Sequence, residues 1–456
     1  MTALTTRAER HTNPITVGEG ARFTVIHPHC IRIEHSPQGT FVDEPSFFAI
    51  HREARCPDFQ MTEDGGRIVI DTGAIRLSCR PDGKALGPRN LSARVRHGER
   101  WVEWKPGQRN RANLGGTAET LDGWTGARAL EEGLLSRDGW YLLDDSTGPL
   151  QKDGWVSSRG ERGSDWYLFG YGNDYRAAFQ AFAAIAGKAP LPRRYTLGSW
   201  YSRYWAYTSE DYRQIVTEYA EKDFPLDMMV MDMDWHITHP REAFGPDAPA
   251  EGQVWTGFTW DRKLLPDAEA LLKWFHKEGV HVTLNDHPAD GVQPHEAMYS
   301  AFMRGMGADP KSKKTLPFDA GDRNYLETFY RHTHTPREKE GVDFWWLDWQ
   351  QSPYTRSLRD VKNLAWLNHY YYRCAKQGGK RGQTFSRWGG WGDHRHPIHF
   401  SGDAGTGWDM LAFEVPFTAT AGNVGCFFWS HDIGGHMGGR NEEAYTRWCQ
   451  FGALSA

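Results

Sequence analysis

The chain has 456 residues, which is long for one ordinary domain, and we expect two. Its composition, with 39% hydrophobic and 24% charged residues, is typical of a globular protein with sizeable cores. The net charge of −5 is small for this length, so a surface that binds nucleic acid or another polyanion is not expected.

Residues 1–190 are predicted to form a β-sandwich domain. Stretches such as RFTVIHPHCIRIEH (22–35) and GRIVIDTGAIRLSCRPDG (66–83) place β-branched residues at alternate positions and are broken by turn signals. NDYRAAFQAFAAIAG (173–187) then predicts a helix that ends at Gly187. A stiff Pro-containing linker, KAPLPRR, follows this helix.

Residues 191–456 are predicted to form a catalytic (β/α)8-type TIM barrel. Near-continuous apolar strands alternate there with helical stretches, which is typical of a parallel barrel sheet. Seven strands are visible in the sequence, from LGSWY (197–201) to VGCFFWSHD (424–432). Only a short stretch separates QTFSR (383–387) from HPIHFSGD (396–403), and it is too short for a full helix.

Polar residues stand directly at the ends of these predicted strands. In a barrel such residues converge on the C-terminal face, where catalytic groups sit. A single Asp after a strand is more often the N-cap of the next helix, but acidic groups at so many strand ends, beside Trp, Phe or His, favour a functional cluster. The set consists of Asp232, Asp234, Asn285, Asp286, Asp348, Arg387, Asp403, His431 and Asp432.

Glycoside cleavage is the chemistry that such a cluster suits best. One carboxylate attacks the anomeric carbon while a second protonates the leaving oxygen. Apolar walls raise the pKa of the acid, and a nearby Arg keeps the nucleophile ionised. The 21 tryptophans of the chain are more than a core needs, and such rings stack on the apolar faces of sugars.

Three features stand out: FWWLDWQQ (344–351), the sixteen-residue step from Arg387 to Asp403, and SHDIGG (430–435). Together they resemble motifs of glycoside hydrolase family 31, the retaining α-glucosidase and α-xylosidase family. GWYLLDDS, YGNDYRAAFQAF and MDMDWH are also similar, so the resemblance runs from about residue 130 to the end. It implies hydrolysis of terminal α-linked sugars without a cofactor, with a small carbohydrate as the partner. The implied residues are Asp348 as nucleophile, Asp403 as acid/base, and Asp232, Trp346, Arg387 and Asp432 as ligands of the sugar.

The sequence departs from the family pattern around this site. Many α-glucosidases of the family read W-x-D-M-N-E at the nucleophile, whereas Trp349, Gln350 and Gln351 follow Asp348 here. Phe400 replaces a Trp that is usual three residues before the acid, and His436 stands where Phe is common. These residues are expected to border the sugar, so glucose, xylose, galactose and N-acetylgalactosamine all stay open.

The three tryptophans near Asp348 are expected to have the same structural role. Trp345, Trp346 and Trp349 should wall the pocket and keep it dry. A catalytically silent carbohydrate-binding relative would lose a carboxylate, and because Asp348 and Asp403 are both present an enzyme is favoured. A transglycosylase would use the same residues and differ only in its acceptor.

Other functions find less support in the sequence. His394, His396 and His399 have spacings that can chelate zinc, but no H-E-x-x-H motif accompanies them. The dispersed Lys and Arg residues form no basic groove, and no glycine-rich phosphate loop follows a strand. We therefore expect neither a metal site nor a nucleotide or nucleic-acid partner.

Features of the whole chain predict a cytoplasmic protein without a membrane partner. The six cysteines are scattered, with no C-x-x-C pair, so we expect reduced and mostly buried thiols. The stretch MTALTTRAERHTNP lacks the apolar core of a secretory signal, and no apolar run reaches the length of a membrane span.

The predicted barrel is one strand short, because a closed barrel of this type needs eight. We expect the chain to lack strand eight and C-terminal β domains, and a natural seven-stranded form is the alternative. Residues 1–456 alone are expected to aggregate or to fold without activity, since unpaired strand edges would expose backbone donors and acceptors.

Overall fold

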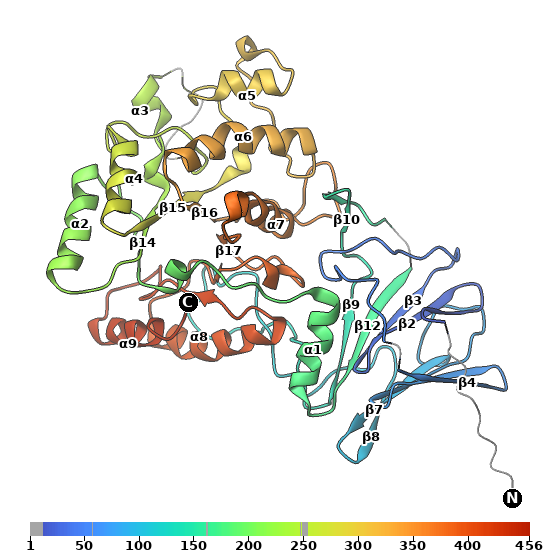
Figure 1. The fold of residues 1–456 in the computed structure, drawn as a ribbon. Coiled ribbons are helices and arrows are strands. Elements are labelled where there is room, and N and C mark those ends of the chain that lie inside the picture. The colour runs from blue at the N-terminus through green and yellow to red at the C-terminus, as the bar shows by residue number, and fades with distance from the viewer. Residues whose placement is uncertain (1–11, 57, 161–162, 247, 249–253) are drawn as a thin grey trace, which may run out of the picture. The chain divides into compact units, whose positions relative to one another are not determined.

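A computed structural model describes residues 12–56, 58–160, 163–246, 248 and 254–456 (Figure 1). The chain divides into two compact units. The first contains the residues up to Ala118, Arg128–Ala189 and Val415–Phe427, and the second contains Glu119–Ala127, Pro190–Glu414 and Phe428–Ala456. The predicted domain boundary after residue 190 stays a prediction, and the units differ from the predicted domains in the segments 119–127 and 415–427.

The first unit consists mainly of antiparallel strands. One five-stranded sheet has the order β1-β2-β3-β12-β9, a second has the order β4-β5-β6-β7-β8, and β10 pairs with β11. Alternate apolar residues of both five-stranded sheets, such as Ile31 and Leu77, belong to one buried core, which confirms the predicted sandwich. The strands are β1 (Ile15–Val17), β2 (Ala21–His27), β3 (Cys30–His35), β4 (Gln60–Asp64), β5 (Arg67–Asp71), β6 (Ile75–Cys79), β7 (Leu91–His97), β8 (Arg100–Trp104), β9 (Trp140–Asp144), β10 (Leu150–Lys152), β11 (Trp155–Ser157) and β12 (Ser164–Gly170).

Helix α1 (Tyr175–Ala186) follows the last strand of this unit and has the ends that the sequence predicts. The side chain of Asp174 accepts a hydrogen bond from the backbone N–H of Ala177 at the N-terminus. At the C-terminus Gly187 has a φ of 78°, which suits glycine, and its N–H donates to the carbonyl of Ala183.

The second unit is built on a parallel sheet of the TIM-barrel class. In the described part of the chain this sheet has seven strands in the chain order β13 to β19, and every neighbouring pair is parallel. The predicted fold class, a β-sandwich followed by a (β/α) barrel sheet, is therefore confirmed. The strands are β13 (Trp200–Tyr201), β14 (Met228–Met231), β15 (His281–Asp286), β16 (Phe344–Leu347), β17 (Phe385–Ser386), β18 (His399–Phe400) and β19 (Trp429–Ser430).

Helices connect most of these strands (Figure 1). Between β17 and β18 only a 3-10 turn, Asp393–Arg395, occurs, as the short spacing in the sequence predicts. Crossover helices let successive strands run parallel, so the carboxyl ends of the strands meet at one edge. The helices are α2 (Ser209–Glu221), α3 (Pro240–Phe244), α4 (Ala268–Lys277), α5 (Tyr299–Gly305), α6 (Arg323–Glu340), α7 (Asn363–Ala375), α8 (Trp408–Ala421) and α9 (Glu442–Gly452).

The two faces of β16 have different surroundings. Phe344 and Trp346 belong to the buried cluster inside the sheet, together with Phe385 and Phe400. Trp345 faces the helices instead, since its indole N–H donates to Glu338 of α6 over 3.1 Å. The prediction that Trp345 walls the pocket is wrong, because successive side chains of a strand point to opposite faces.

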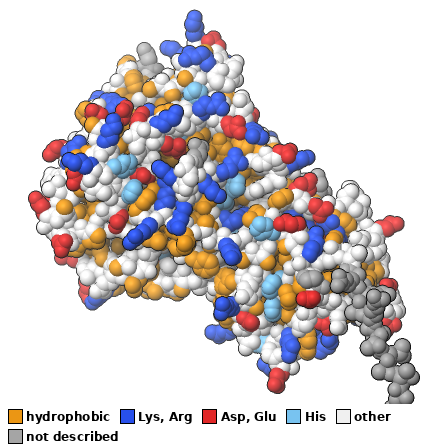
Figure 2. Space-filling model, in the orientation of Figure 1, with side chains coloured by type: hydrophobic (Ala, Val, Ile, Leu, Met, Phe, Trp, Pro, Cys, Tyr) orange, Lys and Arg blue, Asp and Glu red, His pale blue; other side chains and the backbone are white. Residues whose placement is uncertain are grey.

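The cysteines match the expectation of mostly buried thiols, and charges of both signs occur on the surface. None of the six cysteines, which all lie in the described part of the chain, forms a disulfide, and four of them are buried. Basic and acidic side chains both occur across the visible face (Figure 2). No helix among the described residues combines the length and apolarity needed to cross a membrane.

Candidate active site

Side chains from several strand ends gather around Asp348, which directly follows β16. The backbone N–H of Asp348 donates to the carbonyl of Asp286 over 3.0 Å, so the ladder between β15 and β16 continues to this residue. Its carboxylate forms an ion pair with Arg387, the residue after β17. Asn285 Nδ2 and His287 Nε2 lie 3.1 and 3.2 Å from the second carboxylate oxygen. Asp348 is only 5% exposed, so these contacts hold the carboxylate in one position.

The surroundings of Asp348 keep it ionised. Burial by itself would raise the pKa of Asp348, but the charges and hydrogen bonds of Arg387 and His287 outweigh it and hold this pKa well below its usual range. Burial likewise opposes the charged form of His287, yet Asp348 raises the pKa of this imidazole. A carboxylate with these partners is suited to nucleophilic attack.

Arg387 is itself held by a segment that lies far away in the sequence. Its Nη2 donates to Asp122 over 2.9 Å, and its Nε donates to the hydroxyl of Thr120 over 3.1 Å. Asp122 also accepts the backbone N–H of Asp403 over 2.7 Å. One carboxylate outside the barrel strands thus positions both Arg387 and the loop that carries Asp403.

Asp403 follows β18 and lies close to Asp348. Gln350 Nε2 lies 3.4 Å from Asp348 Oδ1 and 3.5 Å from Asp403 Oδ2, so these two oxygens can be at most about 7 Å apart. Burial and then the charge of Asp348 raise the pKa of Asp403 above its usual value, although the side chain keeps 29% exposure. The pKa of Asp348 is therefore below its usual value and that of Asp403 is above its usual value, as a nucleophile and an acid require.

Two further acids complete the cluster. His436 Nδ1 lies 3.7 Å from Asp432 and 3.9 Å from Asp403. Burial and the charges of Asp403 and Asp348 raise the pKa of Asp432 well above its usual value. Burial also raises the pKa of Asp232 to about 7, although its side chain accepts the backbone N–H of Met233.

Aromatic rings line the inner face of the sheet below these acids. The rings of Trp346 and Phe400 meet edge to face with centroids 5.4 Å apart, and Phe385 packs against both. The guanidinium of Arg387 lies 4.6 Å from the centre of the Phe400 ring. Phe400 thus supports the arginine that holds Asp348.

The structure turns two of the polar strand-end side chains away from this cluster. The carboxylate of Asp286 accepts hydrogen bonds from Tyr371 of α7 and lies 2.8 Å from the imidazole of His334. His431 pairs with Glu414 of α8 at 2.9 Å. The expectation that all strand-end side chains share one site is wrong for these two, since each belongs to the helix-facing set of its strand.

Two of the three histidines that suggested a chelating motif, His396 and His399, contact a buried carboxylate. Asp393 receives His396 at 2.8 Å and His399 at 3.2 Å, and it also accepts Asn368 at 2.8 Å. A different trio, Asp403, Asp432 and His436, has ligand atoms within 4.8 Å of one another, a spacing that can accept a cation. The carboxylates of that trio belong to the candidate active site.

Three contributors were missed in the sequence analysis. His287 directly follows the Asn285-Asp286 strand end, so its position was a usable signal. Asp122 and Thr120 lie in the stretch ETLDGW, where only the Asp-Gly turn signal is visible. No local pattern connects that turn with Arg387, because the contact joins residues that are far apart along the chain.

Loops of the second unit border an open cavity of about 760 Å³, and the carboxylates of the candidate site are not among its lining residues. Thr256, Asp290, Phe318 and Asn363 are among its lining residues. The hydroxyl of Thr256 donates to the carbonyl of His287, so the wall of the cavity also supports the candidate site.

The chain has a parallel barrel sheet, and two carboxylates, Asp348 and Asp403, lie close together at its carboxyl edge. These features define the class of (β/α)-barrel proteins with a carboxylate-pair site. Residues 189–456, more than half of the chain, match the description "Glycosyl hydrolases family 31 TIM-barrel domain". The chain belongs to glycosyl hydrolase family 31.

Curated relatives of this family are similar at low identity. Alpha-glucosidase 2 of Bacillus thermoamyloliquefaciens is 23% identical over 325 residues, which are 64% of this chain and 39% of the relative. An alpha-xylosidase of Saccharolobus solfataricus is 24% identical over 317 residues, 63% of this chain and 40% of the relative. The aligned part thus spans about two fifths of the length of each relative, 39% and 40% respectively.

Among solved structures, a GH31 dextranase of Flavobacterium johnsoniae in complex with glucose has the same fold. The TM-score is 0.70 at 17% identity, and the match covers 96% of this chain and 62% of the dextranase. At this identity the likeness concerns the fold alone.

Proposed function

We propose that the protein is a retaining, exo-acting α-glycoside hydrolase that works through a covalent glycosyl-aspartate intermediate. The observation that carries this proposal is the pair Asp348 and Asp403, which both lie within 3.5 Å of Gln350 Nε2 and have pKa values displaced in opposite directions. Membership of glycosyl hydrolase family 31 supports it. The names of the two curated relatives, an alpha-glucosidase and an alpha-xylosidase, support it as well.

In the first step Asp348 attacks the anomeric carbon and forms an ester with the sugar. The glycosidic bond breaks at the same time, and Asp403 gives its proton to the leaving oxygen. In the second step Asp403, now a carboxylate, takes a proton from water. The oxygen of that water bonds to the anomeric carbon, and Asp348 leaves as a carboxylate with the anomeric configuration retained.

The neighbouring residues give each carboxylate its role. Arg387 and His287 stabilise the negative charge of Asp348 before attack and after release. Asp232, which follows β14, and Asp432, which follows β19, are the proposed partners of the sugar hydroxyls, and Trp346 is the proposed apolar wall. His436 lies near both Asp403 and Asp432, which supports a role for it beside the bound sugar.

The proposed substrate is a small carbohydrate with a terminal α-linked sugar. We favour glucose modestly over xylose, galactose and N-acetylgalactosamine. The two Gln residues after Asp348 and the imidazole of His436 change the polar groups that face the sugar, so the specificity of relatives is not transferred to this chain. Transglycosylation uses the same residues with a sugar hydroxyl in place of water.

A panel of p-nitrophenyl α- and β-glycosides tests the proposal. We expect release of nitrophenol from at least one α-glycoside, and proton NMR should show the α-anomer as the first product. A 5-fluoro glycosyl fluoride of the preferred sugar should label Asp348, and peptide mass spectrometry would identify the residue. Activity on β-glycosides alone, a β-anomer released first, or a label on another residue would contradict the mechanism.

We also propose that the protein works in the cytoplasm. The six cysteines form no disulfide in the described part of the chain, which supports a reducing compartment. Fractionation of the source cells with an antibody against the chain tests this, and recovery outside the cytoplasm would contradict it.

A further inference from the structure

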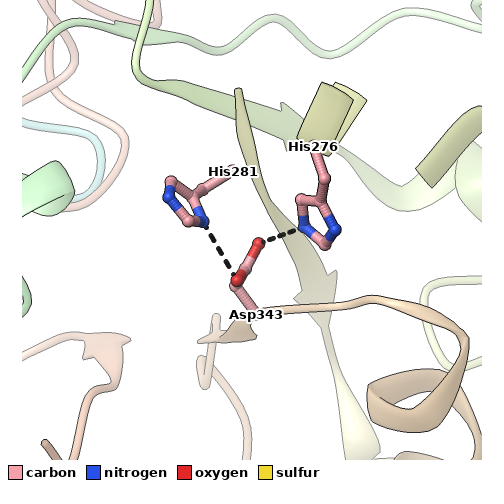
Figure 3. A group of neighbouring side chains, drawn as sticks. All are labelled: His276, His281 and Asp343. Atoms are coloured by element: carbon pink, nitrogen blue, oxygen red, sulfur yellow. Dashed lines mark hydrogen bonds and ion pairs between the residues drawn. The ribbon is translucent and has the colours of Figure 1, made fainter. Parts of the chain in front are cut away.

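A second group of ionisable side chains lies at the opposite end of β15 and β16 from the candidate active site. Asp343 directly precedes β16, His281 opens β15, and His276 lies in the last turn of α4. Both imidazoles point toward the carboxylate, one from the helix and one from the strand (Figure 3). His276 Nε2 lies 2.9 Å from Asp343 Oδ2, and His281 Nδ1 lies 3.1 Å from Asp343 Oδ1.

The spacing of these three groups is close to that of metal ligands. In a tetrahedral zinc site with bonds of about 2.0–2.1 Å, neighbouring ligand atoms are about 3.3 Å apart. The two nitrogen-oxygen distances of 2.9 and 3.1 Å are near this value, and all three ligand atoms lie within 4.8 Å of one another. A small rotation of the partly exposed His276 ring would bring its nitrogen to the same side as that of His281.

Both oxygens of the carboxylate have partners, His276 and the backbone N–H of Val282 at Oδ2 and His281 at Oδ1, so an ion on Oδ1 would replace the direct contact with His281. The backbone N–H of Val282 donates to Asp343 Oδ2 over 2.9 Å, and this bond is compatible with a metal on Oδ1. Backbone donors that hold the far oxygen of a ligating carboxylate fix its orientation and raise metal affinity.

The ring of His281 is fixed, and the group is open to solvent. Tyr195 stacks on the His281 imidazole with ring centres 3.6 Å apart and an angle of 14° between the planes. The side chains of His276 and His281 keep 37% and 34% of their exposure, whereas that of Asp343 keeps 10%. An ion could therefore enter from solvent and meet one rigid and one adjustable imidazole.

We infer that His276, His281 and Asp343 form a binding site for a divalent transition-metal ion of the zinc type. Two imidazole nitrogens with one carboxylate oxygen favour zinc, cobalt or nickel over calcium and magnesium, which take oxygen ligands. Among the described residues no fourth His, Cys, Asp or Glu belongs to the group, so water completes the coordination. The site does not depend on the proposed glycosidase activity.

The ion would connect the end of α4 to the starts of β15 and β16. Because the three ligands come from separate elements, they are brought together only in the folded chain, and an ion that binds there stabilises the folded state. Arg193 and Lys380 are positively charged and lie near the group, since Arg193 bonds the carbonyl of Asp343 and Lys380 lowers the pKa of His276. We therefore expect a dissociation constant on the order of micromolar, weaker than for four-ligand structural zinc sites.

Cobalt titration of the EDTA-treated, dialysed protein tests the site. We expect a visible d–d absorption band that saturates at one equivalent, and zinc should displace it and raise the melting temperature by ~3 °C. His276→Ala and His281→Ala should each weaken binding roughly 10-fold or more. His51→Ala is the matched control, since this exposed histidine pairs with Glu53 at 3.4 Å and lies outside the group, and it should leave binding unchanged.

The other trio with similar spacing, Asp403, Asp432 and His436, provides the main competing explanation. His436→Ala should leave the cobalt band intact, and X-ray absorption of the wild-type zinc complex should show two imidazole ligands. A band that is lost in His436→Ala, a single imidazole ligand, or no saturable band in the wild-type protein would overturn the inference. The X-ray absorption result decides even where a substituted chain fails to fold.

Discussion

An aspartate lies at each end of β16, and the two have similar charge but different neighbouring residues. Asp343 lies before the strand and Asp348 after it, and both side chains keep 10% or less of their exposure. Burial would raise the pKa of each carboxyl, yet basic partners hold both pKa values below their usual range. Asp343 lies beside two imidazoles. Asp348 instead contacts Arg387 and His287, and its charge raises the pKa values of Asp403 and Asp432.

The difference follows from the position of each residue along one strand. Asp348 lies five positions after Asp343, an odd step, so the two side chains belong to opposite faces of the strand. Asp343 belongs to the helix-facing set of Trp345, and Asp348 belongs to the interior set of Trp346. An ionised, buried aspartate is thus common to both ends, and only the neighbouring acids at the carboxyl edge make a site for acid/base chemistry.

The largest effect is expected from removing Asp348. Asp348→Ala should lower turnover by roughly 10⁴-fold or more, because the covalent intermediate can no longer form. Steady-state kinetics on the preferred p-nitrophenyl α-glycoside measures this. Asp343→Asn is the matched control at the other end of β16, and it should change kcat less than about 3-fold. Equal losses in both variants would contradict the distinction between the two ends.

Asp403→Ala should have a large effect that depends on the leaving group. Loss of general acid catalysis costs roughly 10²–10⁴-fold for substrates with a poor leaving group. Activated leaving groups need little protonation, so a dinitrophenyl glycoside should lose far less, and azide should restore part of the rate. A loss of the same size for all leaving groups would show that Asp403 is not the acid.

His436→Phe should change the pH profile of the reaction. The acid form of Asp403 is the active form, so kcat/KM falls as pH rises through its pKa. The charge of His436 lowers the pKa of Asp403, which burial and Asp348 otherwise raise. Removing this imidazole should therefore move the alkaline limb to higher pH by ~0.5 unit. A shift to lower pH, or none, in the measured profile would contradict the role of His436.

The smallest effect is expected from His276→Ala in metal-free protein. The hydrogen bond to Asp343 raises the pKa of His276, so the pair stabilises the fold below the unfolded value of about 6.5 and loses this effect as pH rises. The lowered pKa of Asp343 sets the acid limit, since its contribution is present above about 3.9 and is lost as pH falls.

Because His276 is 37% exposed, the loss on His276→Ala should be only about 0.5 kcal/mol at pH 5.5 and smaller at pH 8.5. Urea unfolding in EDTA at the two pH values measures it. His51→Ala serves as the control. A larger loss at pH 8.5 than at pH 5.5 would contradict the pairing.

Much of the barrel could be predicted because local patterns report it. The apolar run before Asp348 and the helical periods between strands follow from the burial of β14 to β16. The short step from Arg387 to Asp403 correctly predicts that no α-helix lies between β17 and β18. The orientation of Asp286 and His431 was not predicted, because a residue at a strand end can continue either face of the strand.

By itself, the sequence determined the two types of architecture and the candidate residues at the strand ends. These depend on hydrophobic periodicity and on turn and cap residues, which act over a few positions. Only the tertiary structure decided which of these residues meet. It brought Asp122 to Arg387, Gln350 between Asp348 and Asp403, and His276 to Asp343. Contacts between residues far apart along the chain depend on how strands and loops pack, and no local pattern encodes them.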